Sequence, residues 1–196
     1  AYTFAVHVPI AGLSLLSPLL GWPLLLLPSH IAVLEMIIDP SCGLIFEGTE
    51  AEPHIMERPP RPLGQPMVTG WVLFLSVLQG AMVLGGCVFA YYFANRLGYP
   101  AERLRAMVFS TLVFANLGLI LVSRSWSETA LRTLWHGGVV LWVLILGTLG
   151  LGGLVLLVPP LQRLFSLAPL SLGDIGACLA MAATSVAWFE VGKLGF

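Results

Sequence analysis

Residues 24–46 read LLLLPSHIAVLEMIIDPSCGLIF, an apolar segment that carries two carboxylates, Glu35 and Asp39, in its middle third. The segment is long enough to cross a bilayer as a helix, which takes roughly 20 apolar residues. A charged side chain at the centre of a membrane helix costs at least about 3 kcal/mol, so an acid at this depth is a candidate functional residue by default. The segment therefore predicts both a membrane span and a site.

The composition of the whole chain supports a membrane protein. Of its 196 residues, 58% are hydrophobic and only 10% are charged, and the mean hydropathy is +0.93. Soluble domains carry about 25% charged residues, and disordered chains are poor in apolar ones, so both classes are excluded. Nine Lys and Arg against ten Asp and Glu leave no basic excess for phosphates, which excludes a nucleic-acid partner. We expect the lipid bilayer to be the principal surroundings of the chain.

Charged residues and prolines divide the chain into six long apolar runs. Barrel strands would alternate in polarity over about ten residues, whereas these runs are unbroken. The predicted fold is therefore all-α membrane: one domain over 1–196, a bundle of six transmembrane helices. The predicted spans are about 1–21, 24–46, 67–94, 106–122, 135–158 and 171–191, with a polar loop at 47–66. Lys and Arg are almost evenly divided between the two sides, so the positive-inside rule barely orients the bundle.

The spacing of the two acids defines a candidate cation site. Glu35 and Asp39 are four residues apart, so on a helix they share one face about 6 Å apart. Paired carboxylates suit a hard cation such as Ca²⁺ or Mg²⁺, or a proton carried by the pair. Pro40 lacks a backbone N–H, so we expect the second helix to be interrupted near Asp39–Pro40, as helices are at transporter ion sites. The alternative is that both acids are protonated and bond neighbouring helices.

Two further polar residues lie inside predicted spans. A hairpin through Trp22 would bring His7 of the first span level with Asp39, where it could be a ligand or a packing residue. Asn116 lies in the middle of the fourth span, where it could offer a carbonyl oxygen to an ion or bond another helix. We include both residues as candidate members of the cation site.

The cysteines and the start of the chain carry less information. The cysteines Cys42, Cys87 and Cys178 are far apart and form no metal-ligand spacing, so we expect small buried hydrophobes. The chain opens on Ala1 inside an apolar run without a basic stretch, which is unlike a signal peptide. We expect it to be a fragment of a longer protein.

The loop after the second span contains the most specific motif. Residues Ile55–Arg61 read IMERPPR, downstream of the acid pair and Pro40. This arrangement resembles the sixth transmembrane helix and the following cytoplasmic loop of P-type cation-transporting ATPases of the calcium-pump-like group. Gly70–Trp71 and Met107–Asn116 resemble the seventh and eighth helices of that family. The resemblance covers essentially the whole chain, from late in the fifth helix to the tenth, which is the carboxy-terminal transmembrane domain.

The resemblance implies roles for individual residues. It places loop 47–66 in the cytoplasm and puts Glu35 and Asp39 at the cation-ligand positions of the sixth helix, where Glu35 replaces an asparagine. Other positions depart from the calcium pumps, which carry asparagine, glutamate, threonine and glutamate where this chain has His7, Ile10, Ile38 and Asn116. One of the two calcium sites thereby lacks most of its oxygen ligands. The resemblance thus implies a pump for a single cation, with the ion left open.

The chain has no part that could handle ATP. It contains neither an Asp-Lys-Thr-Gly motif nor a Gly-x-x-x-x-Gly-Lys loop, and Lys193 is its only lysine. The resemblance implies that ATP and Mg²⁺ bind in domains outside this chain, so that the remaining ATPase helices and a cytoplasmic headpiece are its partners.

We therefore predict the membrane part of an ATP-driven cation pump, inactive alone, in a bacterial plasma (inner) membrane. It would have no catalytic and no cofactor-binding residue of its own. The alternative is a free-standing, non-catalytic membrane subunit or regulatory remnant. An Asp-Lys-Thr-Gly motif encoded in frame upstream would favour the pump.

Overall fold

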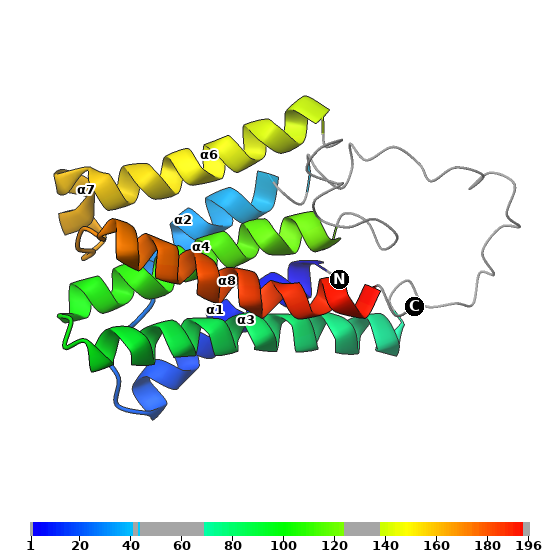
Figure 1. The fold of residues 1–196 in the computed structure, drawn as a ribbon, viewed down its shortest axis with the longest axis horizontal. Coiled ribbons are helices and arrows are strands. Elements are labelled where there is room, and N and C mark those ends of the chain that lie inside the picture. The colour runs from blue at the N-terminus through cyan, green and yellow to red at the C-terminus, as the bar shows by residue number, and fades with distance from the viewer. Residues whose placement is uncertain (1, 41–42, 44–68, 124–137, 194–196) are drawn as a thin grey trace, which may run out of the picture.

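The computed structural model describes residues 2–40, 43, 69–123 and 138–193, and within these ranges the regular structure is all helical. The helices are α1 (Tyr2–Leu19), α2 (Pro28–Pro40), α3 (Gly70–Arg96), α4 (Ala101–Ser123), α6 (Gly138–Leu157), α7 (Pro159–Leu164) and α8 (Leu172–Lys193). The longest of them run along the long axis of the molecule, with the start of α1 and the end of α8 toward the same end (Figure 1). The all-α prediction is confirmed for these residues.

Five of these helices are long and apolar enough to cross a membrane, judged by length and composition: α1, α3, α4, α6 and α8. They correspond to five of the six predicted spans. The sixth, predicted over 24–46, contains α2, which has 13 residues and is too short by itself. The rest of that span lies largely outside the described residues, as does loop 47–66, so the count of six spans is confirmed only in part.

Helix α4 begins earlier than the sequence predicts. Residues up to Arg105 were expected in a polar loop, but the helix starts at Ala101 and takes Arg103 and Arg105 into its first turns. Pro100 precedes the helix, and its carbonyl accepts the backbone N–H groups of Arg103 (2.9 Å) and Leu104 (3.0 Å). Charge marks the membrane boundary in the sequence, whereas the helix continues past that boundary into the polar layer.

The prolines Pro159 and Pro160 follow the predicted fifth span, 135–158, and begin α7. Pro159 takes the first position of this short helix, where a proline ring has the required φ and the missing N–H would have no partner anyway.

Helix α2 is regular from Pro28 to Pro40, including Leu34–Asp39. The residues directly after Pro40 lie outside the described ranges, so the interruption expected near Asp39–Pro40 stays a prediction. Cys42 and the loop motif Ile55–Arg61 lie outside the described residues.

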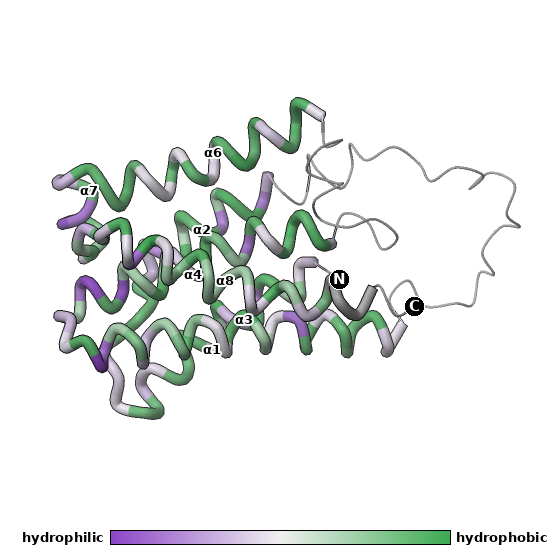
Figure 2. The backbone as a smooth tube through the Cα atoms, in the orientation of Figure 1, coloured by the Kyte–Doolittle hydropathy of each residue, from purple (hydrophilic) through white to green (hydrophobic). Residues whose placement is uncertain are grey.

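Helix α4 is the centre of the bundle. It packs against α1, α3, α6 and α8, and α1 in turn packs along α3. Its buried side chains lie on all sides, as expected of a helix enclosed by others, and the largest fully buried ones include Met107, Phe109, Leu112, Leu119 and Ile120. Figure 2 shows apolar residues along most of every long helix. The core therefore forms around α4, and α2 lies at its edge.

Residues with a left-handed backbone conformation follow three of the helices. Gly21, with φ +66°, follows α1, and the N–H of Trp22 bonds the carbonyl of Ser17 (2.9 Å), which is the pattern of a Schellman cap. The chain thus turns at Gly21–Trp22, where the hairpin was expected. After α7 the same pattern places Ser166 at φ +50°, a conformation that costs a side chain roughly 1 kcal/mol.

We expect Ser166→Gly to raise the free energy of unfolding by about 1 kcal/mol, because glycine takes the left-handed conformation without a Cβ clash. Thermal unfolding of the purified protein in detergent would measure the gain. Ser171→Ala is the matched control with the opposite sign, since its hydroxyl oxygen accepts the N–H of Asp174 (3.2 Å) at the start of α8. A lower unfolding temperature for Ser166→Gly would contradict the argument.

Candidate cation site

His7 lies on the side of α1 that is turned away from the core. Its neighbours Ala5, Val6 and Pro9 are buried, whereas the His7 side chain is 48% exposed. The ring Nδ1 is 2.7 Å from the backbone carbonyl of Thr3. Since a carbonyl only accepts hydrogen bonds, Nδ1 carries the proton and donates it. This bond fixes the ring and directs Nε2 away from its own helix.

Glu35 and Asp39 lie on the outward face of α2. The buried residues of this helix follow the spacing of an amphipathic helix and are His30, Val33, Leu34, Ile37 and Ile38. Glu35 and Asp39 fall between these positions, and the Glu35 side chain is 37% exposed. The core thus fixes the rotation of α2, and that rotation turns both carboxylates outward.

One contact joins the two helices at this level. The Nε2 atom of His7 is 3.5 Å from Oε1 of Glu35, so the structure brings together two of the four predicted site residues. Asp39 lies one turn farther along the same helix with an exposed side chain. The described residues hold no group of three His, Cys, Asp or Glu that could surround a metal ion. The observed cluster is therefore a His–Glu pair with a second carboxylate nearby.

The amino-terminal end of α2 is anchored by His30, whose ring is fully buried. Its Nδ1 accepts the N–H of Leu27 (3.1 Å), so the proton is on Nε2, which donates to the carbonyl of Phe165 (2.6 Å) after α7. Both ring nitrogens are thereby used to join α2 to the α7–α8 connection. Sequence reasoning missed this role, because an isolated histidine has no motif that distinguishes a buried anchor from a surface residue.

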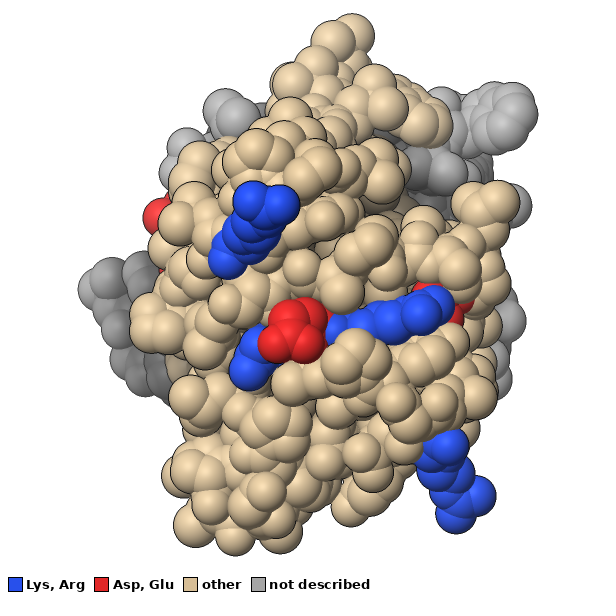
Figure 3. Space-filling model, turned by 90° about the vertical axis from the view of Figure 1, so that its left-hand side faces the viewer, with Lys and Arg blue, Asp and Glu red and all other residues tan. Residues whose placement is uncertain are grey.

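Arg105 of α4 makes further hydrogen bonds at the same end of the bundle. Its Nε donates to the carbonyl of Leu24 (2.8 Å), and its Nη1 lies 3.5 Å from the carbonyl of Ser166. This end carries four basic residues, Arg96, Arg103, Arg105 and Arg163. Figure 3 shows basic atoms on this face with acidic atoms among them. The α1–α2 connection is thus held to the core by side chains of α2 and α4.

The position of His30 gives the distance of the two carboxylates of α2 from this end of the bundle. A helix rises about 1.5 Å per residue, so Glu35 lies roughly 8 Å and Asp39 roughly 14 Å inside the end marked by His30. The apolar layer of a bilayer is about 30 Å thick. An apolar layer of that thickness beginning near His30 would contain both carboxylates, which lie on the outward face of α2.

Asn116 is fully buried in α4, and neither atom of its amide has a hydrogen-bond partner in the structure. The predicted bond to another helix is therefore not formed among the described residues. A buried polar group without a partner costs about 1–3 kcal/mol. No recorded contact joins Asn116 to His7 or Glu35, so a ligand role for it stays a prediction.

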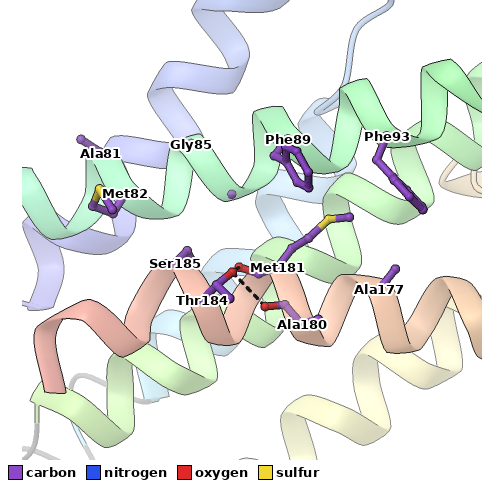
Figure 4. A pocket seen from close by; sticks show the side chains of 11 residues that line it. Ala81, Met82, Gly85, Phe89, Phe93, Ala177, Ala180, Met181, Thr184 and Ser185 are labelled. Carbon is purple, nitrogen blue, oxygen red and sulfur yellow. Dashed lines mark hydrogen bonds between the residues drawn. The ribbon is translucent and has the colours of Figure 1, made fainter. Parts of the chain in front are cut away.

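A groove of about 660 Å³ between α3 and α8 offers no site for a cation (Figure 4). Its walls are mostly apolar or small residues, and the hydroxyl groups of Thr184 and Ser185 donate to carbonyls of their own helix. Small residues allow close packing of the two helices here, because a Cβ on Gly86 would be 3.0 Å from Cβ of Ser185. Cys87 and Cys178 are buried free thiols, which confirms their prediction.

Comparison with known proteins assigns the family. Residues 23–195 match the family model described as "Cation transporting ATPase, C-terminus". The chain therefore belongs to the cation-transporting P-type ATPases and is an integral membrane protein. This confirms the resemblance that the acid pair and the IMERPPR motif had indicated.

Individual relatives have related names. The chain is similar to the "Endoplasmic reticulum calcium ATPase srcA" of Aspergillus fumigatus (26% identity over 91% of this chain and 22% of the relative). It is also similar to the mouse "Calcium-transporting ATPase type 2C member 2" (28% identity, 97% and 21%). The "Probable cation-transporting ATPase F" of Mycobacterium tuberculosis is 30% identical over 49% of this chain and 11% of the relative. The chain spans about a fifth of the length of the first two.

Proposed function

We propose that the chain is the carboxy-terminal membrane part of an ATP-driven cation pump, and that Glu35 and Asp39 bind the transported cation. The observation that carries this proposal is the outward face of α2, which presents both carboxylates at membrane depth with Nε2 of His7 3.5 Å from Glu35. Charged groups at this depth need a partner or an ion. A cation satisfies that need with oxygen ligands already in place.

The rest of the site and the energy source would come from outside this chain. The described residues contribute a His–Glu pair and a nearby carboxylate, whereas ions of this kind take four to eight ligands. The named relatives are about five times longer. Their additional helices would cover the exposed face of α1 and α2, and a cytoplasmic headpiece would bind ATP and Mg²⁺. The chain alone would not pump, and we place the complete pump in a bacterial plasma membrane.

The packing of α2 suits a helix that moves during transport. It is held at its amino-terminal end by His30, and it does not share the extensive contacts that join the other long helices. An apolar gap of about 420 Å³, lined by Met36, Ile37 and Pro40 on one side and by α6 on the other, lies beside it. A helix anchored at one end with space beside the other can change access to its carboxylates by tilting.

The test is ion-stimulated formation of the phosphoenzyme from ATP by the complete pump. We expect Glu35→Gln and Asp39→Asn each to raise the ion concentration for half-maximal phosphorylation about 100-fold or more, because each variant replaces a carboxylate ligand with a neutral amide. Glu102→Gln is the matched control, since this carboxylate is at the anchored end of the bundle and 52% exposed. Unchanged ion dependence in both site variants would remove Glu35 and Asp39 from the mechanism.

A further inference from the structure

We infer that the transported ion is a divalent first-row transition metal, such as Mn²⁺, Fe²⁺, Co²⁺ or Zn²⁺, and that Nε2 of His7 is one of its ligands. This inference rests on the proposed function and specifies the substrate of the same site. The observation that supports it is the contact between the imidazole of His7 on α1 and the carboxylate of Glu35 on α2.

The orientation of the His7 ring is that of a metal ligand. Histidines that bind metals almost always donate their other ring N–H to a carbonyl, a carboxylate or water, which fixes the tautomer and directs the free nitrogen at the ion. Nδ1 of His7 makes such a bond to the carbonyl of Thr3 (2.7 Å). In the neutral ring this bond leaves the electron pair on Nε2, and Nε2 is the atom that faces Glu35. The ring is thus prepared for an ion on the Glu35 side.

The separation of the two donor atoms also fits a shared ion. Metal bonds of about 2.0–2.1 Å at a tetrahedral angle place two ligand atoms roughly 3.4 Å apart. Nε2 of His7 and Oε1 of Glu35 are 3.5 Å apart. An ion could therefore enter between them with little movement of α1 or α2.

The kind of donor atom selects the class of ion. Ca²⁺ and Mg²⁺ prefer oxygen ligands throughout, whereas imidazole nitrogen suits the first-row transition metals. Thiolates would instead favour Cu(I). Of the cysteines that the structure describes, Cys87 and Cys178 are buried in α3 and α8, and Sγ of Cys178 is 3.4 Å from the carbonyl of Met107. The combination of imidazole and carboxylate donors, as in the pair His7 and Glu35, fits Mn²⁺, Fe²⁺, Co²⁺ and Zn²⁺.

The competing interpretation is that His7 only pairs electrostatically with Glu35 and never touches the ion. Both interpretations predict that replacing His7 disturbs the pump, so activity alone does not separate them. They differ in whether imidazole nitrogen is bound to the metal. They also differ in whether the loss on substitution depends on the metal used.

The experiment uses the complete pump in detergent without nucleotide, loaded with Mn²⁺ and observed by pulsed electron paramagnetic resonance. We expect the coupling of a directly bound imidazole ¹⁴N in the unsubstituted protein and its loss in His7→Asn. In equilibrium binding we expect His7→Asn to weaken Mn²⁺ about 10–100-fold. The same substitution should change Ca²⁺ affinity less than about threefold, because asparagine still offers an oxygen to Ca²⁺.

Ser14→Ala is the control on the same helix, since its hydroxyl donates only to the carbonyl of Ile10 (2.9 Å), and it should keep both the ¹⁴N coupling and the Mn²⁺ affinity. Three results would overturn the inference: no ¹⁴N coupling in the unsubstituted pump, tighter binding of Ca²⁺ than of Mn²⁺, or equal losses for both ions in His7→Asn. The first two need no variant and hold even if His7→Asn does not fold.

The two proposals fail in different ways. If Glu35→Gln and Asp39→Asn leave the ion dependence unchanged, the proposed cation site itself is wrong. If those variants abolish ion dependence while the Mn²⁺ signal lacks imidazole nitrogen, only the inference about His7 and the ion class is wrong.

Discussion

Gly80→Val is expected to prevent normal packing of α1 on α3. A Cβ at Gly80 would be 2.6 Å from the backbone oxygen of Ala5 and 2.6 Å from Cβ of Val8, and neither atom is the end of a flexible side chain. The helices would have to move apart, and overpacking of this kind costs about 3 kcal/mol or more. Because Ala5 and Val8 flank His7 on α1, the shift would also displace the site. The unfolding temperature in detergent would measure the loss.

Gly85→Val is the matched control for this prediction. It lies on the same helix, but nothing outside its own helix is within 4 Å of a Cβ built there, so we expect little loss of stability. Gly12→Ala should be intermediate, because the atoms nearest to its Cβ all belong to the side chain of Leu84, which can change rotamer. If Gly80→Val and Gly85→Val proved equally stable, the close approach of α1 and α3 would not be a determinant of the fold.

Asp174→Ala is the second substitution for which we expect a large loss, about 3 kcal/mol. The Asp174 side chain is only 5% exposed and accepts hydrogen bonds from Nη2 of Arg103 (2.6 Å), the hydroxyl of Tyr99 (3.1 Å) and the N–H of Ser171 (2.9 Å). Removing the carboxylate leaves these donors without their acceptor, and breaking a buried ion pair costs several kcal/mol. The network joins the α3–α4 connection to the start of α8. Chemical or thermal unfolding in detergent would report the change.

A double-mutant cycle separates the ion pair from the other bonds of Asp174. We expect Asp174→Ala combined with Arg103→Ala to cost less than the sum of the single losses, by about 1–2 kcal/mol, because the pair is partly buried. The neighbouring pair of Arg105 and Glu102 is 4.0 Å apart, with Glu102 52% exposed, so Glu102→Gln should cost less than about 0.5 kcal/mol. Additive losses at Asp174 and Arg103 would show that the two residues do not stabilise the fold as a pair.

Much of the fold could be predicted from the sequence because apolar length is a local property. Unbroken apolar runs identified the helices that became α1, α3, α4, α6 and α8, since a bilayer accepts little else. The helix ends were harder to predict. Arg103 and Arg105 were expected in a loop because charge marks the water boundary, whereas the helix itself is started by Pro100 and continues past that boundary.

The candidate site, like the fold, could be predicted from the sequence only in part. The four-residue spacing of Glu35 and Asp39 was sufficient to predict that they share a helix face. The sequence also named His7 as a candidate, but it could not decide between a ligand and a packing residue, because the level of His7 depends on how the α1–α2 turn is held. Hydrogen bonds of His30 and Arg105 to backbone carbonyls hold it, and such bonds leave no pattern in a sequence.

The sequence alone thus determined that this is a helical membrane protein, which residues are too polar for the bilayer, and which pump family it resembles, because each follows from composition, spacing or a short motif. Only the tertiary structure decided that His7 faces Glu35 and that both carboxylates turn away from the core. The rotation of α2 is set by the burial of Val33, Leu34, Ile37 and Ile38 against other helices, and such burial depends on residues distant in the chain.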